Sequence, residues 1–333
     1  MQNSEGKKQR TEDRVLRTEN KKLTADCLGS LKGLECMDST LTRWKEEHES
    51  QIRSFKLMVY TLSRSPLSVI GFCLVSVFLI LALIGPLIII YPGDIKGTLH
   101  LDKKLQPPSS GHPFGTDEVG CDIYSRVVMG TRLSLQIGLI IIFVAMGIGI
   151  PLGMAAGYLG GWVNEVIMRM TDIFLSVPGL LLALAIVGAL GPGIKNAMIA
   201  LSLVWWPGYV RLVQGKTLAL REEPYVEAAR SLSASKLRLL FFHILPNCTS
   251  PIIVKASMDM GMAILFAANL GFIGVGAQPP EPEWGAMISA GRNYLPDHWW
   301  LATFPGLAIL ITVLGFNLFG DGLRDVLDPQ SRG

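Results

Sequence analysis

The sequence predicts an all-α membrane protein, and three observations support this fold class. Of its 333 residues 50% are hydrophobic and only 17% are charged, and the mean hydropathy of +0.39 exceeds that of a typical soluble domain. Six apolar runs are each long enough to cross a bilayer, which requires ~20 mostly apolar residues. Polar segments rich in turn-forming residues separate the runs. About six transmembrane helices are therefore expected.

Prolines and many glycines interrupt these apolar runs, which is tolerated in a bundle of helices. On one run, Gly147, Gly149, Gly153 and Gly157 leave little side chain, which favours close contact with another helix. The expected spans are Leu67 to Ile90, Leu133 to Leu159, Val166 to Ala189, Ile194 to Val213, Ser250 to Val275 and Trp300 to Phe319.

Two segments precede the first span, and both differ from the spans in composition. Residues 1–50 are polar and of mixed charge, which predicts a partly disordered cytoplasmic tail. Residues 51–65 have an apolar stripe at helical spacing beside basic residues, which is typical of an amphipathic helix at the inner membrane surface or of an ordinary soluble one. The expected organisation is 1–50 tail, 51–65 amphipathic helix, 66–132 first span and outer loop, 133–325 core, and 326–333 cytoplasmic C-terminal tail.

The distribution of basic residues predicts the orientation. The N-terminal tail and the segment from Gly215 to Asn247 are rich in Lys and Arg, whereas the segment from Ala277 to Trp299 carries only Arg292. Loops rich in Lys and Arg remain in the cytoplasm. With an even number of spans, both termini are therefore expected to be cytoplasmic.

The polar segment from Gly215 to Asn247 predicts two short helices joined by a corner. Pro224 follows two glutamates, which suits the first turn of a helix. Two possible N-cap serines interrupt the pattern, and Pro246 ends the second helix. We expect one face to be formed by Tyr225, Ala228, Ala229 and Leu232, and the other, packed on the membrane bundle, by Leu237, Leu240, Phe241 and Ile244.

The same segment resembles the EAA loop of ABC importer permeases, although an ordinary amphipathic loop is the alternative. The resemblance implies a coupling helix that docks on a separate ATPase subunit. The family's usual glycine at the corner is Ser233 here, and a serine held at positive φ is strained by about 1 kcal/mol or more. The matching residues, to which the resemblance assigns coupling, are Glu227, Ala228, Ala229, Ser233, Ala234, Ser235, His243, Leu245 and Pro246.

Three further motifs are similar to the dipeptide, oligopeptide and nickel branch of that family, in its C-type subunit. The family commonly has arginine where this chain has Cys121. Together the matches cover the chain from about Pro66 to its end. The motifs are QPPSSGHPFGTDEVGCD before the second span, GFIG followed by QPP and PEWG from Gly271 to Gly285, and FNLFGD from Phe316 to Asp321.

The resemblance implies a type I ABC importer permease fold with cytoplasmic coupling helices, multi-pass in the inner or plasma membrane. It implies a translocation path for short peptides, with nickel or oligosaccharides as alternative cargoes. Its partners would be a homologous second permease subunit, two ABC ATPase subunits, an extracytoplasmic solute-binding protein and membrane lipid. The chain would be no enzyme and hold no cofactor or metal, because ATP and Mg²⁺ would bind the ATPase partners.

Other function classes have weaker support in the sequence. An ion-coupled secondary transporter would need unpaired midplane charges and paired broken helices, which are not evident. A membrane hydrolase would need a motif such as HExxH or GxSxG, and neither is present. Basic residues form no stripe, which excludes nucleic acid as an expected partner. Gly215, Lys216 and Thr217 imitate the end of a phosphate-binding loop, but Val210 stands where that loop needs glycine.

Two carboxylates and four other residues within the spans are candidates for a role in the membrane. Asp172 has Arg169 three residues before it, and Asp259 has Lys255 four residues before it, so each is expected to form an ion pair on its own helix near the cytoplasmic interface, with a proton relay as the alternative. By resemblance, the fifth span lines the translocation path, although a Met-rich face is also typical of packing. The path candidates are Met258, Met262, Phe266 and Asn269.

Overall fold

The structure is a computed structural model that describes residues 65–327. Within these residues the chain is almost entirely helical, and Thr116 and Asp122 form an isolated antiparallel bridge. The all-α fold class is therefore confirmed for this part of the chain. The expected N-terminal tail and almost all of the expected amphipathic helix lie outside the described residues, as does most of the C-terminal tail.

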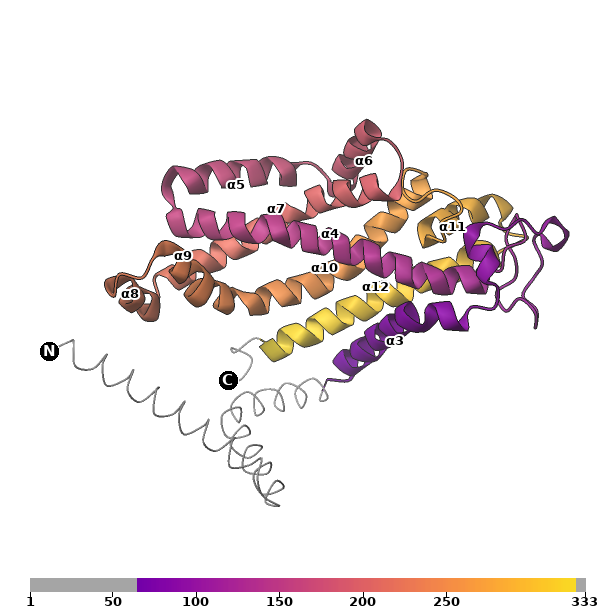
Figure 1. Ribbon diagram of the computed structural model, residues 1–333, viewed down its shortest axis with the longest axis horizontal. Helices are drawn as coiled ribbons and strands as arrows, with labels where there is room; N and C mark the ends of the chain where they lie inside the picture. Colours follow the sequence, from indigo (N-terminus) through magenta and orange to yellow (C-terminus); the bar gives the residue numbers. More distant parts are fainter. Residues whose placement is uncertain (1–64, 328–333) are drawn as a thin grey trace, which may run out of the picture. The chain divides into compact units, whose positions relative to one another are not determined.

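The long helices pack against one another in one bundle (Figure 1). Helix α4 packs against α7, α10 contacts both of them, and α12 joins α10 to α3. Their buried faces carry large apolar side chains, among them Ile141, Leu201 and Ile264. The long helices are α3 (Pro66–Ile88), α4 (Ile123–Leu159), α7 (Ile194–Arg221), α10 (Leu245–Ile273) and α12 (Trp300–Leu327).

Glycines on α4 bring it close to α7. A Cβ added to Gly153 would lie 2.7 Å from the carbonyl oxygen of Val210, and one added to Gly157 would lie 2.6 Å from Cβ of Thr217. Gly149 is equally close to α7, whereas Gly147 has no heavy atom within 4 Å of such a Cβ. The expected close helix contact is thus made by three of the four glycines, which recur every four residues on one helix face.

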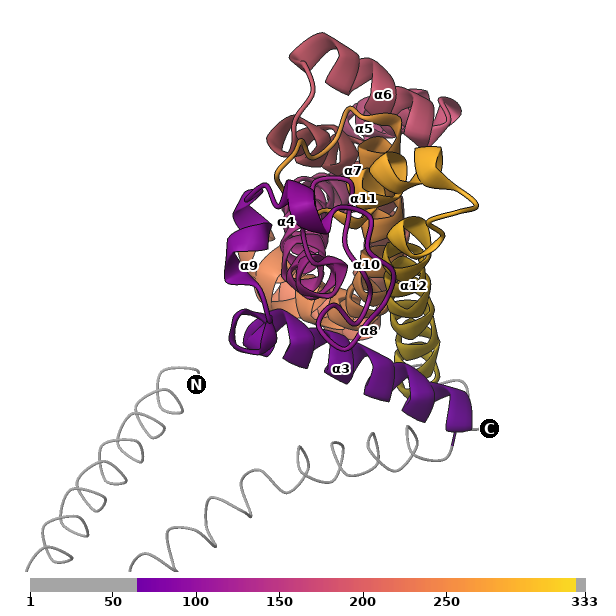
Figure 2. The ribbon, with the colours of Figure 1, turned by 90° about the vertical axis from the view of Figure 1, so that its right-hand side faces the viewer.

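The third expected span is broken, which the apolar run did not predict. Helices α5 (Gly161–Ser176) and α6 (Gly179–Leu190) meet at 91°. Pro178 lies between them and has no N–H to continue the hydrogen-bond ladder, so α5 ends before it. The pair lies at one edge of the bundle and α3 at the opposite edge (Figures 1 and 2).

The number of apolar spans is lower than the number of apolar runs. Within the described residues four helical segments are long and apolar enough to cross a membrane, or five if α5 and α6 together form one span. Helix α7 has 28 residues but is not among them. It is less apolar because it carries Arg211, Gln214 and Lys216, and its buried face packs on α4.

The two ends of the bundle differ in structure. At one end lie the short helices α8 (Pro224–Ser231) and α9 (Lys236–Arg238), and at the other lie the loop after α3 and the short helix α11 (Trp284–Gly291) (Figure 1). Figure 2 looks onto the second end. There Asp122 caps α4 by accepting hydrogen bonds from the backbone N–H (2.8 Å) and the hydroxyl (2.7 Å) of Ser125.

Candidate functional site

The helical corner has the geometry expected from the sequence. Helix α8 (Pro224–Ser231) is followed by a turn and by α9 (Lys236–Arg238). Ser233 has φ +58°, and its N–H donates to the carbonyl oxygen of Arg230 at 3.0 Å. The hydroxyl of Ser235 accepts a hydrogen bond from the N–H of Arg238 at 3.4 Å. The corner is therefore a left-handed helix end followed by a capped helix start.

The face that anchors the corner differs from the expected one. Ile244 is buried and Leu240 half-buried as expected, but Leu237 and Phe241 are 67% and 52% exposed, and Leu239 is buried instead. Residues Leu239–Ile244 form a π-helical turn, η3. A π-helix has more residues in each turn than an α-helix, so the sequence spacing of 3.6 misassigns which side chains point inward.

Exposed apolar side chains surround the corner and define what we call the corner surface: Tyr225, Leu232, Leu237, Phe241 and Phe242. Leu232 is 85% exposed. The face that the sequence predicts on α8 is therefore largely exposed: Tyr225, Ala228 and Leu232 are exposed and Ala229 is half-buried. Glu227 is exposed beside it. Val226, which is fully buried, holds α8 in place instead.

The coupling candidates lie within one continuous segment. Glu227, Ser233 and Ser235 are exposed, and His243 and Leu245 are half-buried where η3 joins α10. The carbonyl oxygen of His243 accepts a hydrogen bond from Nδ2 of Asn247 at 2.7 Å, and the same Nδ2 donates to the hydroxyl of Tyr225 at 3.2 Å. Helix α8 is thereby tied to the start of α10.

A cavity of about 880 Å³ opens between α7, α10 and α12. Its wall includes three cationic side chains, Lys216, Lys255 and Arg324, and one carboxylate, Asp259. Its other lining residues are Leu212, Pro246, Asn247, Ser250, Pro251, Val254, Met258, Met262, Asn317 and Leu327.

The four path candidates separate into two pairs. Met258 and Met262 line this cavity, although Met258 also packs against Gly320 of α12. Phe266 instead makes an edge contact with Trp205, with ring centroids 5.0 Å apart. Neither Phe266 nor Asn269 is part of the cavity wall.

Sequence reasoning did not find the contribution of α12 to this cavity. Asn317 is part of the FNLFGD motif noted above, and this membership was the signal that could have pointed to a role for α12 in the cavity. Lys216 was noticed as one of the basic residues of the polar segment and as part of an imitated phosphate-binding loop. The structure places it inside α7, a helix with no preceding strand in the described residues, which agrees with the rejection of such a loop.

One of the two expected intramembrane ion pairs is present, and the other has a different partner. Nζ of Lys255 lies 3.0 Å from Oδ2 of Asp259. Asp172 pairs with Arg211 of α7, and Arg169 pairs with Glu165. The first pair is local to one helix, whereas the contact of Asp172 joins α5 to α7 and depends on tertiary packing.

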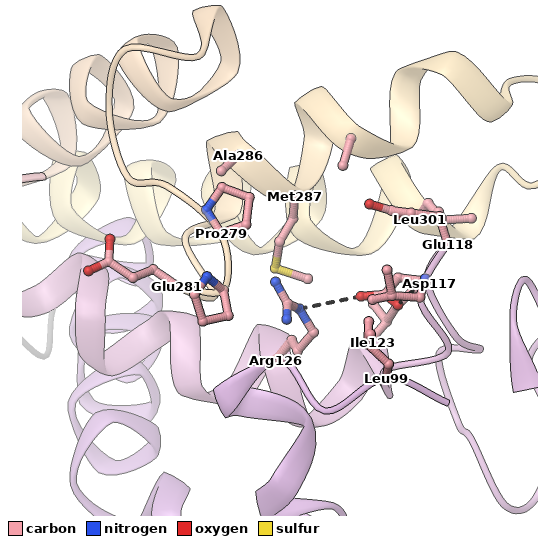
Figure 3. A pocket seen from close by; sticks show the side chains of 14 residues that line it. Leu99, Asp117, Glu118, Ile123, Arg126, Pro279, Glu281, Ala286, Met287 and Leu301 are labelled. Atoms are coloured by element: carbon pink, nitrogen blue, oxygen red, sulfur yellow. Dashed lines mark hydrogen bonds and ion pairs between the residues drawn. The ribbon is translucent and has the colours of Figure 1, made fainter. Parts of the chain in front are cut away.

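A smaller cavity of about 200 Å³ lies at the opposite end of the bundle, where Figure 3 shows Arg126 directed toward Asp117. Nε of Arg126 is 3.6 Å from Oδ2 of Asp117. Burial raises the pKa of the Asp117 carboxyl, although Arg126 and the backbone N–H groups of Cys121 and Val119 lower it. The contact of Arg126 with Asp117 thus links α4 to the loop that precedes it.

Cys121, where the family commonly has arginine, is buried in the same loop. Its thiol donates to the carbonyl oxygen of Thr98 at 3.2 Å. Burial, followed by the nearby charge of Asp117, raises the pKa of the Cys121 thiol to about 12. The thiol therefore stays protonated and unreactive at neutral pH. Among residues 65–327, no group of three or more His, Cys, Asp or Glu is placed to hold a metal ion.

The described residues thus form a helical bundle with membrane-length apolar helices, a cavity between α7, α10 and α12, and a basic helical corner. Residues 149–333 match the family described as "Binding-protein-dependent transport system inner membrane component", and residues 54–108 match the "N-terminal TM domain of oligopeptide transport permease C". The chain therefore belongs to the binding-protein-dependent transport system inner membrane components. It is the permease of an ABC importer, and ATP hydrolysis is carried by separate ATPase subunits.

Curated relatives are similar over most of their length. The chain is 48% identical to the probable D,D-dipeptide transport system permease protein DdpC of Escherichia coli K12, covering 83% of this chain and 92% of the relative. It is 42% identical to the dipeptide transport system permease protein DppC of Alkalihalophilus pseudofirmus, covering 86% and 93%. It is 47% identical to the glutathione transport system permease protein GsiD of Pectobacterium atrosepticum, covering 72% and 79%.

Among solved structures, the MetNI methionine ABC transporter in an inward facing conformation is similar to this chain. The TM-score is 0.50 at 19% sequence identity, and the match covers 62% of this chain and 98% of the other. At this identity the likeness concerns the fold alone, and it confirms the permease fold expected from the sequence.

Proposed function

We propose that this permease imports short peptides, with the cavity between α7, α10 and α12 as its part of the translocation path. A homologous second permease subunit closes the path, two ATPase subunits bind at the cytoplasmic end, and a solute-binding protein delivers the peptide outside. The names of the three relatives, two for dipeptides and one for glutathione, support peptides over nickel or oligosaccharides.

The observation that carries the proposal is the continuity of the corner with the cavity. Pro246 and Asn247 line the cavity, and Asn247 is hydrogen-bonded to Tyr225 of α8. A force on the corner is thus transmitted directly into α10, the helix that contributes most of the cavity wall. The exposed apolar corner surface supports docking of an ATPase subunit, since exposed apolar patches commonly mark interaction sites.

The test of coupling uses reconstituted vesicles that contain the whole transporter. Glu227→Lys and Ala229→Asp should abolish peptide uptake and substrate-stimulated ATP hydrolysis while membrane abundance stays normal. Both changes place a charge at the expected docking surface, and an unpaired charge is costly to bury. Glu165→Lys, a matched change at an exposed glutamate of α5, should leave both rates intact. Wild-type uptake and ATP hydrolysis in the Glu227 and Ala229 variants would refute the coupling role.

The test of orientation uses single cysteines in a background without the native ones. A cysteine at exposed Ser109, before α4, should react with an impermeant thiol reagent added outside the cell. A cysteine at exposed Ser231, in the corner, should react only after the membrane is opened. Labelling of position 231 from outside intact cells would reverse the proposed orientation.

A further inference from the structure

The ion pair of Lys255 and Asp259 lies deep in the cavity wall. Lys255 is ten residues and Asp259 fourteen residues beyond Leu245, the first residue of α10. At a rise of 1.5 Å per residue these positions are about 15 Å and about 21 Å along a helix of 29 residues. The pair therefore lies near the middle of a membrane-spanning helix, where charged groups are costly and usually serve transport.

The surroundings of Lys255 hold its ammonium group beside the cavity. Gly208 of α7 leaves room for the lysine stem, because a Cβ added there would lie 3.2 Å from Cε and 3.3 Å from Nζ of Lys255. Nζ also lies over the ring of Tyr209, 5.2 Å from its centroid, where an ammonium is attracted to the aromatic face. These neighbours position the charge without taking up its hydrogen-bond donors.

Both members of the pair retain unused hydrogen-bonding capacity. Nζ of Lys255 can donate three hydrogen bonds, and a carboxylate has about four acceptor sites. Nζ lies 3.0 Å from Oδ2 and 3.3 Å from Oδ1 of Asp259, and the hydroxyl of Tyr209 also faces this carboxylate, which leaves further donor sites on Nζ and acceptor sites on the carboxylate. The side chains of Lys255 and Asp259 are 30% and 15% exposed, and both residues line the cavity.

The cavity suits a ligand with charged ends. At about 880 Å³ it falls in the range of small-ligand sites, about 300 to 1,000 Å³. Beyond Lys255, toward the start of α10, Lys216 and Arg324 add two cationic groups. Asp259 is the one carboxylate among the lining residues, so the wall offers a single place for an ammonium group and several for a carboxylate.

We propose that Lys255 and Asp259 form a binding site for the two termini of a short peptide during its passage. Asp259 accepts hydrogen bonds from the amino terminus, and Lys255 donates to the carboxylate. Without peptide, the two side chains neutralise each other. The inference rests on the proposed peptide import, and it assigns terminus recognition to the permease itself, in addition to any selection by the binding protein.

The experiment measures peptide binding in the cavity without the binding protein. A cysteine replaces Met262, which is 37% exposed and lines the cavity, in the otherwise cysteine-free complex. Its labelling by a thiol reagent is followed at increasing concentrations of alanyl-alanine, N-acetyl-alanyl-alanine and alanyl-alanine amide. With the pair intact, alanyl-alanine should protect best, and blocking either end should raise the half-protection concentration about tenfold or more.

Substitutions then assign each terminus to a side chain. Asp259→Asn should weaken protection by alanyl-alanine but not by the N-acetylated peptide, and Lys255→Met should weaken protection by alanyl-alanine but not by the amide. Glu165→Gln and Arg169→Met provide a matched control, since these residues form another i,i+4 pair, exposed on α5. They should leave every protection curve unchanged.

Several outcomes would overturn the proposal. Equal protection by the three peptides in the complex with Lys255 and Asp259 intact would show that the termini are not recognised, and this comparison needs no change to the pair. Full protection by alanyl-alanine in the uncharged double variant K255M/D259N would show that the pair takes no part in binding the termini. If wild-type vesicles import peptides normally while protection ignores the termini, this inference fails alone. Absence of ATP-driven peptide uptake would instead refute the proposed function.

Discussion

Gly271 of α10 lies directly against the carboxylate of Glu283, the residue that caps α11, so that a side chain at position 271 would displace that carboxylate. Glu283 is only 3% exposed. Its two carboxylate oxygens accept hydrogen bonds from the backbone N–H groups of Gly285 (2.9 Å) and Ala286 (2.8 Å). A glycine on one helix therefore makes room for the N-terminal cap of another.

The first prediction follows from this contact. Gly271→Ala should lower the melting temperature of the purified protein, because overpacking costs about 1 to 3 kcal/mol and loss of a cap about 1 kcal/mol more. Gly188→Ala on α6 is the control, since nothing lies within 4 Å of a Cβ there. It should leave the melting temperature unchanged or slightly raised. Equal melting of the two variants would contradict the close fit.

The second prediction concerns the pH dependence of stability at the same residue. Burial raises the pKa of the Glu283 carboxyl above its ordinary value of 4.5, although the N–H groups of Gly285 and Ala286 lower it. An acid with a raised pKa in the folded state contributes most to stability at low pH. That contribution is lost as pH rises from the ordinary value through the folded-state pKa.

Glu283→Gln removes the titration and keeps an oxygen that can accept a capping hydrogen bond. The melting temperature of this variant relative to wild type should therefore rise between about pH 4 and neutral pH. The measurement is thermal unfolding of both proteins in the same detergent at a series of pH values. The difference cancels the titration of other groups, including Asp117, so a constant difference across the series would refute the role of Glu283.

The third prediction tests the contact between α4 and α7. Gly153→Ala should reduce membrane abundance and melting temperature, since its Cβ would lie 2.7 Å from the carbonyl oxygen of Val210 and 2.8 Å from Cβ of Val213. Gly147→Ala, on the same helix but with no atom within 4 Å, should behave like wild type. If both alanines were tolerated equally, the glycines would not determine how closely these helices pack.

Local sequence signals predicted the parts of this protein that depend on local chemistry. Pro224 begins α8, the corner falls at Ser233 with positive φ, and Asp259 pairs with Lys255 one helical turn away. Each feature is determined within a few residues. The long apolar runs likewise predicted α3, α4, α10 and α12, because spanning a bilayer requires both length and hydrophobicity.

Features that depend on tertiary packing were not predictable in the same way. The partner of Asp172 is Arg211, which belongs to a different helix, so spacing along α5 could not find it. The cavity wall is divided among α7, α10 and α12, and the path candidates named from the sequence included only its methionines on α10. Helix α7 packs against α4 but carries Arg211 and Lys216 at exposed positions, so its hydropathy falls below that of the other long helices.

The corner shows how one extra residue changes a prediction based on helical periodicity. The spacing of Leu237, Leu240 and Phe241 predicts that they share a face, but η3 is π-helical. Leu239 is buried instead, and Leu237 and Phe241 become part of the exposed corner surface. Periodicity finds the amphipathic segment, while the hydrogen-bonding pattern of its turns decides which side chains reach the bundle.

The last prediction uses Ser233, which adopts a left-handed φ of +58° in place of the glycine usual at this position in the family. Glycine adopts this conformation without the steric contact that Cβ makes with the following carbonyl, a difference of roughly 1 to 2 kcal/mol. Ser233→Gly should therefore stabilise the corner and keep peptide uptake per ATP hydrolysed at or above the wild-type value. Ser233→Val should lower this ratio, because a β-branched residue at positive φ is strongly disfavoured.

Ser231→Val, in helix α8 two residues before the corner, is the matched control and should keep the wild-type ratio. Uptake and ATP hydrolysis are measured in vesicles with equal amounts of each variant, so that loss of coupling is separated from loss of protein. Because Ser233 is exposed, valine there should alter the direction of the chain between α8 and α9 while leaving the buried Val226 and Ile244 in place. Equal coupling in the two valine variants would mean that the left-handed corner is not required to transmit motion from the ATPase to α10.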